Sequence, residues 1–149
     1  MAEAEHPCDG CTGCAMRCTD GVKISEFEYT RIVECLRAAD PVHAGTVLSQ
    51  AKERQWFEEI TYTACLFLDQ RTNLCLVYEA RPLICRLYGR IAPYPCPLEK
   101  IPPDLDARRV LAAYAEQPLA TFQQWMAAEM LFNFADLLGT TEIEPTYEL

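Results

Sequence analysis

The sequence predicts a mainly α-helical fold, with cysteine-rich loops and at most a short β-hairpin. Ser25 and Glu28 have the spacing of a capping box and precede apolar residues that recur every three or four positions. Alanine, leucine and methionine recur at the same spacing between residues 104 and 138. Eight of the nine cysteines lie outside these two helical stretches, in the regions 1–23 and 60–100.

Residues 25–55 are expected to form a helical hairpin. The first helix begins after the capping box and ends near Asp40. Asp40 then has the position of an N-cap, with Pro41 at the first helical position of a second helix. By typical helix lengths this second helix has about a dozen residues and runs toward Gln55.

The region from residue 60 to residue 100 has mixed patterns. Apolar residues alternate with threonine over residues 60–64, and residues 74–78 form a short apolar run. Both patterns are typical of strands, and the polar residues 70–73 between them are typical of a turn. We therefore expect two brief strands joined at residues 70–73.

Proline and glycine mark the expected ends of the remaining helices. Pro82 is placed to begin a short helix that Gly89 ends. The last third of the chain predicts two helices, from residue 104 to about 117 and from 118 to 138. Gly139 is the expected stop, and an acidic tail follows it.

Charge and hydropathy exclude several classes of protein. The chain has 149 residues and a net charge of −9, whereas nucleic-acid binding depends on lysine and arginine contacts to phosphates. No basic or apolar leader precedes the first cysteine, and no run approaches the roughly 18 apolar residues of a membrane span. We therefore expect a cytoplasmic protein without membrane insertion. In a reducing compartment, cysteines serve as metal ligands or catalytic groups more often than as disulfides.

The first 23 residues contain a cysteine run typical of a metal site. Four cysteines have the spacing C-x2-C-x2-C-x3-C: Cys8, Cys11, Cys14 and Cys18. Bacterial ferredoxins use this spacing, with three thiolates on one 4Fe–4S cluster and the fourth directed elsewhere. Ferredoxins place proline after the fourth cysteine, whereas here Thr19 follows Cys18 and the proline-flanked cysteine is Cys96. A chance cluster or disulfide pairing is the alternative.

The later cysteines allow two interpretations from their own sequence context. Cys65, Cys75 and Cys85 lie in apolar sequence, and free cysteine is among the most buried residue types. A packing role is therefore the first interpretation for these three. Cys35 lies on the interior stripe of the first predicted helix and is interpreted as a packing residue.

Three strings between residues 8 and 98 resemble the YkgJ-type cysteine-cluster family. They are CDGCTGC from Cys8, CLFLD from Cys65 and CLVYEARPLICR from Cys75, with Cys96 after them. The family commonly has two adjacent cysteines at the end of its first motif, whereas here Ala15 follows Cys14. The resemblance implies a zinc- or iron-chelating domain of the kind loosely described as an Fe–S oxidoreductase.

With this resemblance, residues 1–149 are expected to form one helical domain with cysteine-rich metal-binding loops at 1–23 and 60–100. The expected metal ligands are Cys8, Cys11, Cys14, Cys18, Cys65, Cys75, Cys85 and Cys96. By analogy with ferredoxins, the first three share a centre with Cys96, which its flanking prolines hold in extended chain. Cys18 then joins the other three ligands in a second centre. A single polynuclear centre of all eight is the alternative.

Charged residues of the second and third strings have candidate roles beside the metal. Arg81 and Arg86 flank Cys85 and are expected to donate hydrogen bonds to thiolate or sulfide, which offsets the negative charge of the ligands. The alternative is that Arg81 pairs with Glu79 and that Arg86 is only a solvated helix residue. Asp69 and Glu79 are expected to have turn or surface roles, with a role as oxygen ligands of the metal as the alternative.

Three functions are consistent with these residues. The first is an iron–sulfur protein, with a 4Fe–4S cluster favoured, or an iron protein, that exchanges electrons with a protein redox partner. The second is a zinc-stabilised module that binds a partner protein, and the third is a metal carrier or sensor. No metal-independent catalytic constellation is visible, so an oxidoreductase activity would depend on the metal alone.

Overall fold

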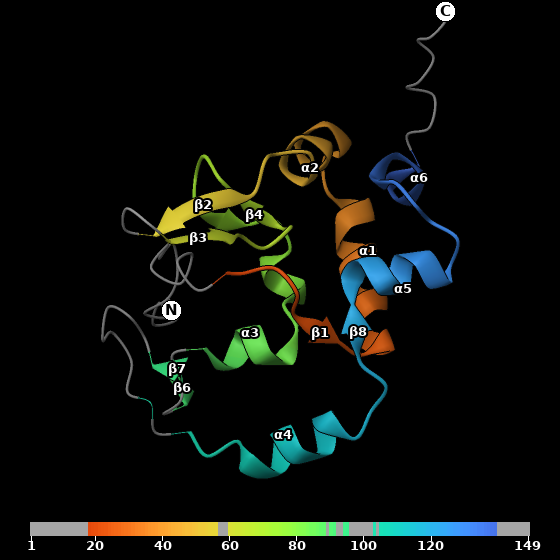
Figure 1. Ribbon diagram of the computed structural model, residues 1–149. Coiled ribbons are helices and arrows are strands. Elements are labelled where there is room, and N and C mark those ends of the chain that lie inside the picture. The colour runs from red at the N-terminus through yellow and green to blue at the C-terminus, as the bar shows by residue number, and fades with distance from the viewer. Residues whose placement is uncertain are drawn as a thin grey trace, which may run out of the picture.

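A computed structural model describes residues 18–56, 60–88, 90–91, 94–95, 103 and 105–139 (Figure 1). Helices account for more of this part of the chain than strands do. The helices are α1 (Glu26–Ala38), α2 (Pro41–Leu48), the 3-10 helix η2 (Tyr78–Ala80), α3 (Leu83–Leu87), α4 (Arg108–Ala115), α5 (Phe122–Ala128) and α6 (Phe134–Leu138). None of these helices is long and apolar enough to span a membrane.

The strands form four antiparallel pairs, so the described fold is mixed rather than mainly α. The pairs are β1 (Lys23–Ile24) with β8 (Ala120–Thr121), β2 (Glu53–Trp56) with β3 (Ile60–Thr63), β4 (Leu68–Asp69) with β5 (Leu74–Cys75), and β6 (Arg90–Ile91) with β7 (Tyr94–Pro95). The prediction of at most one short hairpin is wrong. Most of these strands have two residues, which is too short for the alternation that marks a strand in sequence.

The expected strand partners also change. The strand at residues 60–63 pairs with β2, in the segment that was predicted to continue the second helix toward Gln55. Leu74 and Cys75 pair instead with β4, across the turn at residues 70–73 that the sequence predicted. The predicted turn is therefore confirmed, but it joins different strands.

The helix starts agree with the predicted caps. Glu28 N–H donates to Ser25 Oγ at 3.2 Å, and Ser25 N–H donates to Glu28 Oε1 at 3.0 Å, which completes the capping box of α1. His43 N–H donates to the Asp40 carboxylate at 3.3 Å at the start of α2, with Pro41 as its first residue. Helix α3 follows Pro82 as predicted.

The predicted helix at residues 118–138 is broken into α5 and α6. Met130 between them has a φ of 64°, a left-handed conformation that ends a helix. Asn133 then begins α6, because its side chain accepts a hydrogen bond from Asp136 N–H at 2.8 Å. Gly139, with a φ of 76°, ends α6 as the sequence predicted.

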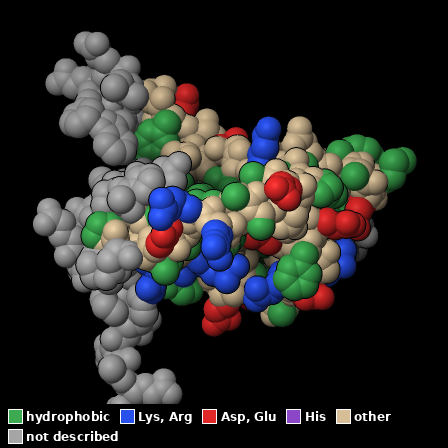
Figure 2. All heavy atoms as spheres, turned by 90° about the horizontal axis from the view of Figure 1, so that it is seen from below, with side chains coloured by type: hydrophobic (Ala, Val, Ile, Leu, Met, Phe, Trp, Pro, Cys, Tyr) green, Lys and Arg blue, Asp and Glu red, His purple; other side chains and the backbone are tan. Residues whose placement is uncertain are grey.

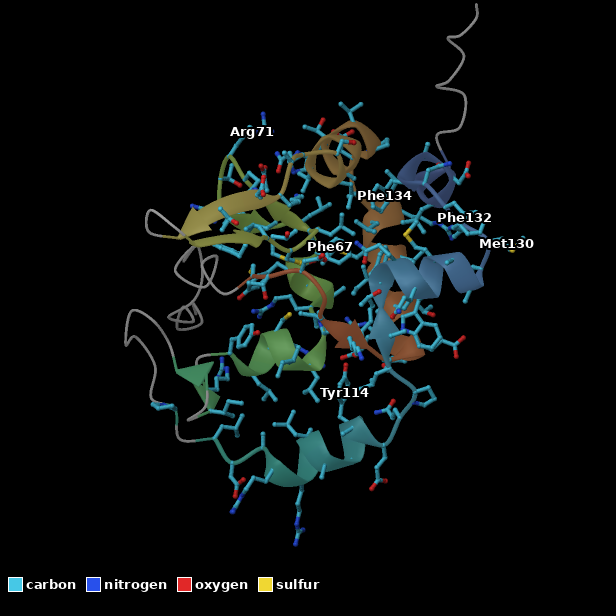
Figure 3. The ribbon with its side chains drawn as sticks, viewed as in Figure 1. Phe67, Arg71, Tyr114, Met130, Phe132 and Phe134 are labelled. Carbon is cyan, nitrogen blue, oxygen red and sulfur yellow. The ribbon has the colours of Figure 1, made fainter. Side chains whose placement is uncertain are left out.

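The main hydrophobic core surrounds α1, which packs against η2, α2, α5 and α6 (Figure 1). Ile32, Leu36 and Leu137 are at most 1% exposed. Phe67 joins this core from the strand side, with its ring 5.0 Å from that of Phe122 (Figure 3). The Trp125 indole N–H donates to Ile24 O at 2.8 Å and fastens α5 to β1.

Candidate metal centre

Cys18 and Cys65 are brought together by backbone pairing. Thr19 bridges Ala64 in an antiparallel arrangement, and Cys65 N–H donates to Cys18 O at 2.8 Å. In this register Cys18 lies opposite Cys65, so their side chains project from the same face of the pair. The segment after the N-terminal cysteine run is thus joined to the first of the later cysteines.

Cys75 reaches the same region through the β4–β5 hairpin. It pairs with Leu68, whose N–H donates to Cys65 O at 3.0 Å. Leu76 N–H also donates to Phe67 O at 2.8 Å, so residues on both sides of the hairpin are held in register. The hairpin therefore places Cys75 beside the turn that begins at Cys65.

Asp69 is a turn residue of this hairpin. Its buried carboxylate accepts hydrogen bonds from Gln50 Nε2 at 2.9 Å and from Arg71 N–H at 3.0 Å. These hydrogen bonds, that of Gln50 above all, hold the pKa of Asp69 below its usual value. Asn73 N–H donates to Asp69 O at 2.8 Å, which closes the turn. The side chain thus has the turn role that the sequence favoured over metal binding.

Cys85 is positioned by α3, which Glu28 attaches to the rest of the fold. Glu28 Oε2 accepts from Leu83 N–H at 2.6 Å, in the first turn of α3. Its Oε1 accepts from Ser25 N–H and from the Tyr114 hydroxyl, so one buried carboxylate connects α1, α3 and α4. Burial and this hydrogen bond raise the pKa of Tyr114. The capping box identified Glu28 only as a local cap, because nothing in the sequence indicates where its second oxygen points.

The four cysteines of the second expected centre lie in one region of the fold. Burial raises the pKa of the thiols of Cys65 and Cys85, and that of Cys75 to about 11. Cys18, Cys65 and Cys75 each raise the pKa of Cys85 further, because a negative charge on any of them repels a thiolate there. The five described cysteines are not in disulfides. In the part of the chain that the structure describes, no three Cys, His, Asp or Glu side chains are close enough to enclose a metal ion.

Two backbone amides donate hydrogen bonds to sulfur atoms of this group. The N–H of Phe67 forms a hydrogen bond to Cys65, and the N–H of Val77 forms one to Cys75, in each case from two residues further along the chain. Both lower the pKa of their cysteine, because a donor stabilises thiolate relative to thiol. Amide N–H groups that donate to sulfur in this way stabilise negatively charged sulfur atoms.

Arg81 supplies one positive charge at this site. It lowers the pKa of both Cys75 and Cys85, as expected for a guanidinium close to both thiols. Its guanidinium carbon lies 3.9 Å from the centre of the Tyr78 ring, and its Nε donates to Tyr78 O at 3.1 Å. Arg81 and Glu79, both in the described part of the chain, form no ion pair with each other.

Lys52, which the sequence did not single out, supplies a second charge. Its Nζ donates to Leu68 O at 2.6 Å, and its charge lowers the pKa of Cys65. Arg86, by contrast, is exposed on α3, and no described residue accepts a hydrogen bond from its guanidinium. Of the two arginines expected beside the thiols, Arg81 therefore has the clearer electrostatic contact.

The remaining cysteines divide into two groups. Cys35 is half-buried against the main core, and burial raises its pKa, which is consistent with a packing residue. Cys8, Cys11, Cys14 and Cys96 lie outside the described residues, as do Gly89 and residues 97–102. The expected first centre therefore stays a prediction.

The donor set fits a soft metal cation. Half-buried thiols that repel each other as thiolates are costly to ionise without a neighbouring cation, and a bound metal removes that cost. Cys18, Cys65, Cys75 and Cys85 are the residues that would hold such an ion here. The thiolate ligands would accept either zinc or iron.

Comparison with known proteins gives one match. No curated protein and no solved structure matches this chain. A family model described as "CxxCxxCC: Putative zinc- or iron-chelating domain" matches residues 7–118, which is more than half of the chain and includes all eight expected ligands. The chain belongs to this CxxCxxCC family.

Proposed function

We propose that this protein carries an iron–sulfur cluster, with a 4Fe–4S cluster favoured, or iron, and serves in electron transfer or redox chemistry. Membership of a zinc- or iron-chelating family supports metal binding in general. The observation that supports the proposal is that four of the expected ligands, from four separate segments of the chain, lie in one region of the fold and affect one another electrostatically: Cys18, Cys65, Cys75 and Cys85.

Three features favour iron and sulfide over a single zinc ion. Eight motif cysteines exceed the four ligands of one closed zinc site, and the N-terminal run has the ferredoxin spacing. The positive charges of Arg81 and Lys52 beside the thiols also offset the negative charge of several thiolates and sulfides. When bound, an iron–sulfur cluster supplies one-electron chemistry.

The residues of this chain hold and shield the centre. Ala64 and Leu68 are each 1% exposed and pack against Cys18 and Cys65 on the strand side. The amides of Phe67 and Val77 donate to the sulfur atoms, and such hydrogen bonds adjust the reduction potential of a cluster. Under the same proposal the protein acts in the reducing cytoplasm with a protein redox partner.

A zinc-stabilised interaction module is the second candidate. The smaller hydrophobic cluster around Cys18 and Cys65 has only two buried residues in the described part of the chain, Ala64 and Leu68. Structural zinc sites stabilise loops that cannot bury enough apolar surface by themselves. In that case the metal would hold the surface that binds a partner protein.

Metal analysis of anaerobically purified protein separates the two candidates. We expect iron and acid-labile sulfide in nearly equal amounts per chain, with visible absorption that dithionite bleaches. Zinc without iron would contradict the iron–sulfur proposal and support the second candidate. Protein that binds neither metal when reconstituted would contradict both.

Single substitutions test the ligand set. Cys75→Ser and Cys18→Ser are expected to lose the same metal, and Cys8→Ser and Cys96→Ser a different one. Cys35→Ser is the matched control, because it removes a half-buried thiol without removing an expected ligand. Loss of all metal from any one of the eight variants would indicate a single polynuclear centre instead.

A further inference from the structure

A second feature of the fold is a cavity of about 340 Å³ beside the start of α1. Three arginines from three different elements line it: Arg31 of α1, Arg81 after η2 and Arg86 of α3. Phe27 and Leu83 add apolar surface to the same wall. The cavity thus combines positive charge with an apolar side.

The charge of this cavity is opposite to that of the protein. The chain has a net charge of −9 and only 13 lysines and arginines, yet three of them meet here. Glu28 is the one carboxylate among the described residues that line the cavity, so three guanidinium charges and one carboxylate give this lining a formal charge of +2. Figure 2 shows Lys and Arg side chains gathered near the middle of the face that α4 borders.

Most N–H donors of the three guanidinium groups have no hydrogen-bond acceptor among the described residues. Arg86 has no such acceptor, and Arg31 has one long contact, from Nη2 to Glu79 O at 3.4 Å. Arg81 uses only Nε, which donates to Tyr78 O. Each guanidinium has five N–H donors, so the three side chains can together surround an acceptor with several oxygens.

The walls of the cavity are fixed by Glu28. Its two oxygens accept from Ser25, Leu83 and Tyr114, so the carboxylate is already satisfied and does not need an arginine partner. Tyr114 extends from α4 toward β1 in Figure 3. Because α1, α3 and α4 are joined at this point, little conformational freedom would be lost when a ligand binds.

We propose that this cavity binds the phosphate group of a small molecule. Guanidinium groups recognise phosphate by paired hydrogen bonds, and a local charge of +2 matches a phosphate dianion. A volume of about 340 Å³ is at the lower end of the range for small-molecule sites. Phe27, which is 70% exposed, offers its ring to the organic part of the ligand. The proposal does not depend on which metal the protein binds.

Calorimetric titration of the full-length, metal-loaded protein tests the assignment. Inorganic phosphate, phenyl phosphate and benzoate are the three probes. We expect phenyl phosphate to bind more tightly than inorganic phosphate, because it also contacts the apolar wall, and benzoate to bind most weakly. Arg86→Gln and Arg31→Gln should each weaken phenyl phosphate binding roughly tenfold or more, since each removes charged hydrogen bonds.

Arg109→Gln is the matched control, because Arg109 is an exposed arginine of α4 that does not line the cavity. It should change the affinity by less than about twofold. An equal loss in Arg109→Gln and Arg86→Gln would contradict the proposal, because it would indicate diffuse attraction by surface charge. Absence of phosphate binding, or equally tight binding of benzoate, would also contradict it.

NMR chemical-shift mapping of the binding site on the wild-type protein avoids any effect of the substitutions on folding. Phenyl phosphate is expected to shift the amide resonances of residues 27–31, 80–86 and 114–117, and to leave those of α2 unchanged. Shifts confined to other parts of the chain would place the phosphate elsewhere and contradict the assignment.

Discussion

The helical core around α1 and the thiol region differ in what holds them together. We define the thiol region as residues 18–20, 63–69 and 74–85. The helical core buries large apolar side chains, each of which contributes about 1.5–3 kcal/mol. The thiol region has its own small cluster of Ala64 and Leu68, against which the half-buried Cys18 and Cys65 pack. From this difference we expect the core to fold by hydrophobic burial and the thiol region to depend on a bound metal.

The two regions are connected at a few positions. Phe67 and Val77 belong to the thiol region but pack in the main core. Glu28 of α1 holds the first turn of α3, which carries Cys85. Changes at these positions should therefore act on both regions, whereas changes elsewhere should act on one.

Metal removal is expected to have the largest effect and to separate the regions. Structural metal sites in small domains contribute on the order of 10 kcal/mol, so the metal-free thiol region should lose order while α1 keeps its buried face. Hydrogen exchange and limited proteolysis after anaerobic chelation check this result. We expect faster exchange at residues 63–69 and 74–85, cleavage within residues 1–23, and slow exchange in α1.

Cys35→Ser should behave like the wild-type protein in this experiment, because the substitution removes no expected ligand. Equal loss of protection in α1 and in the thiol region would show that the two regions fold as one unit. Continued protection of residues 1–23 without metal would contradict metal-dependent order in that segment.

Leu36→Ala should produce the next largest effect, and in the helical core. Leu36 is 1% exposed, and truncation of such a side chain typically costs about 2–5 kcal/mol. The free energy of unfolding should fall by that amount in urea titration, while the metal content per chain stays unchanged. Val42→Ala, at a site 75% exposed on α2, should change stability by less than about 0.5 kcal/mol. Loss of metal in Leu36→Ala would show that the regions are coupled.

Glu28→Gln should weaken the connection between the regions. The amide nitrogen of glutamine cannot accept, so either Leu83 N–H or the donors at Oε1 lose their partner. A buried donor without an acceptor costs about 1–3 kcal/mol, which urea unfolding can measure. Hydrogen exchange at α3 should increase as well. Glu26→Gln removes an exposed carboxylate from the same helical turn and should change neither quantity.

Asp69→Asn should have the smallest effect, which depends on pH. The pKa of Asp69 is lower in the folded than in the unfolded chain, so its carboxylate stabilises the fold above the unfolded pKa of about 4. This stabilisation is lost as the pH falls through the folded pKa. Asp69→Asn should therefore lower stability by about 1 kcal/mol at neutral pH, and the difference should disappear on acidification. Parallel stability curves for the two proteins would contradict this role.

Local signals predicted the helix ends well. The capping box at Ser25, the N-cap at Asp40 and the stop at Gly139 are all confirmed, because each depends on neighbouring residues and backbone conformation alone. The break at Met130 was not predicted. The helical spacing of apolar residues continues across it, and the side chain of Asn133 begins a new helix by capping.

The sequence predicted the turn between two strands but not which strands pair. The turn at residues 70–73 was readable from its polar residues, but the choice of β4 as the partner of β5 was not. A short strand gains most of its stability from its neighbour, and the neighbour is not encoded in its own residues. The set of Cys18, Cys65, Cys75 and Cys85 was predicted from motif spacing and analogy, and it stays a prediction. The structure places Cys18 opposite Cys65 and Cys75 beside the turn that begins at Cys65, but no three metal-ligating side chains of the described residues are close enough to enclose an ion.

The helix caps, the turn at residues 70–73, the cysteine motifs and the family were therefore all readable from the sequence alone, because each depends on residue type and short spacing. Only the tertiary structure decided that Cys18 lies opposite Cys65 and that Glu28 holds α3 through its second oxygen. It also decided that Arg31, Arg81 and Arg86 share one cavity. The physical reason is that long-range contacts arise from packing of whole elements, in which each side chain finds partners distant in the chain.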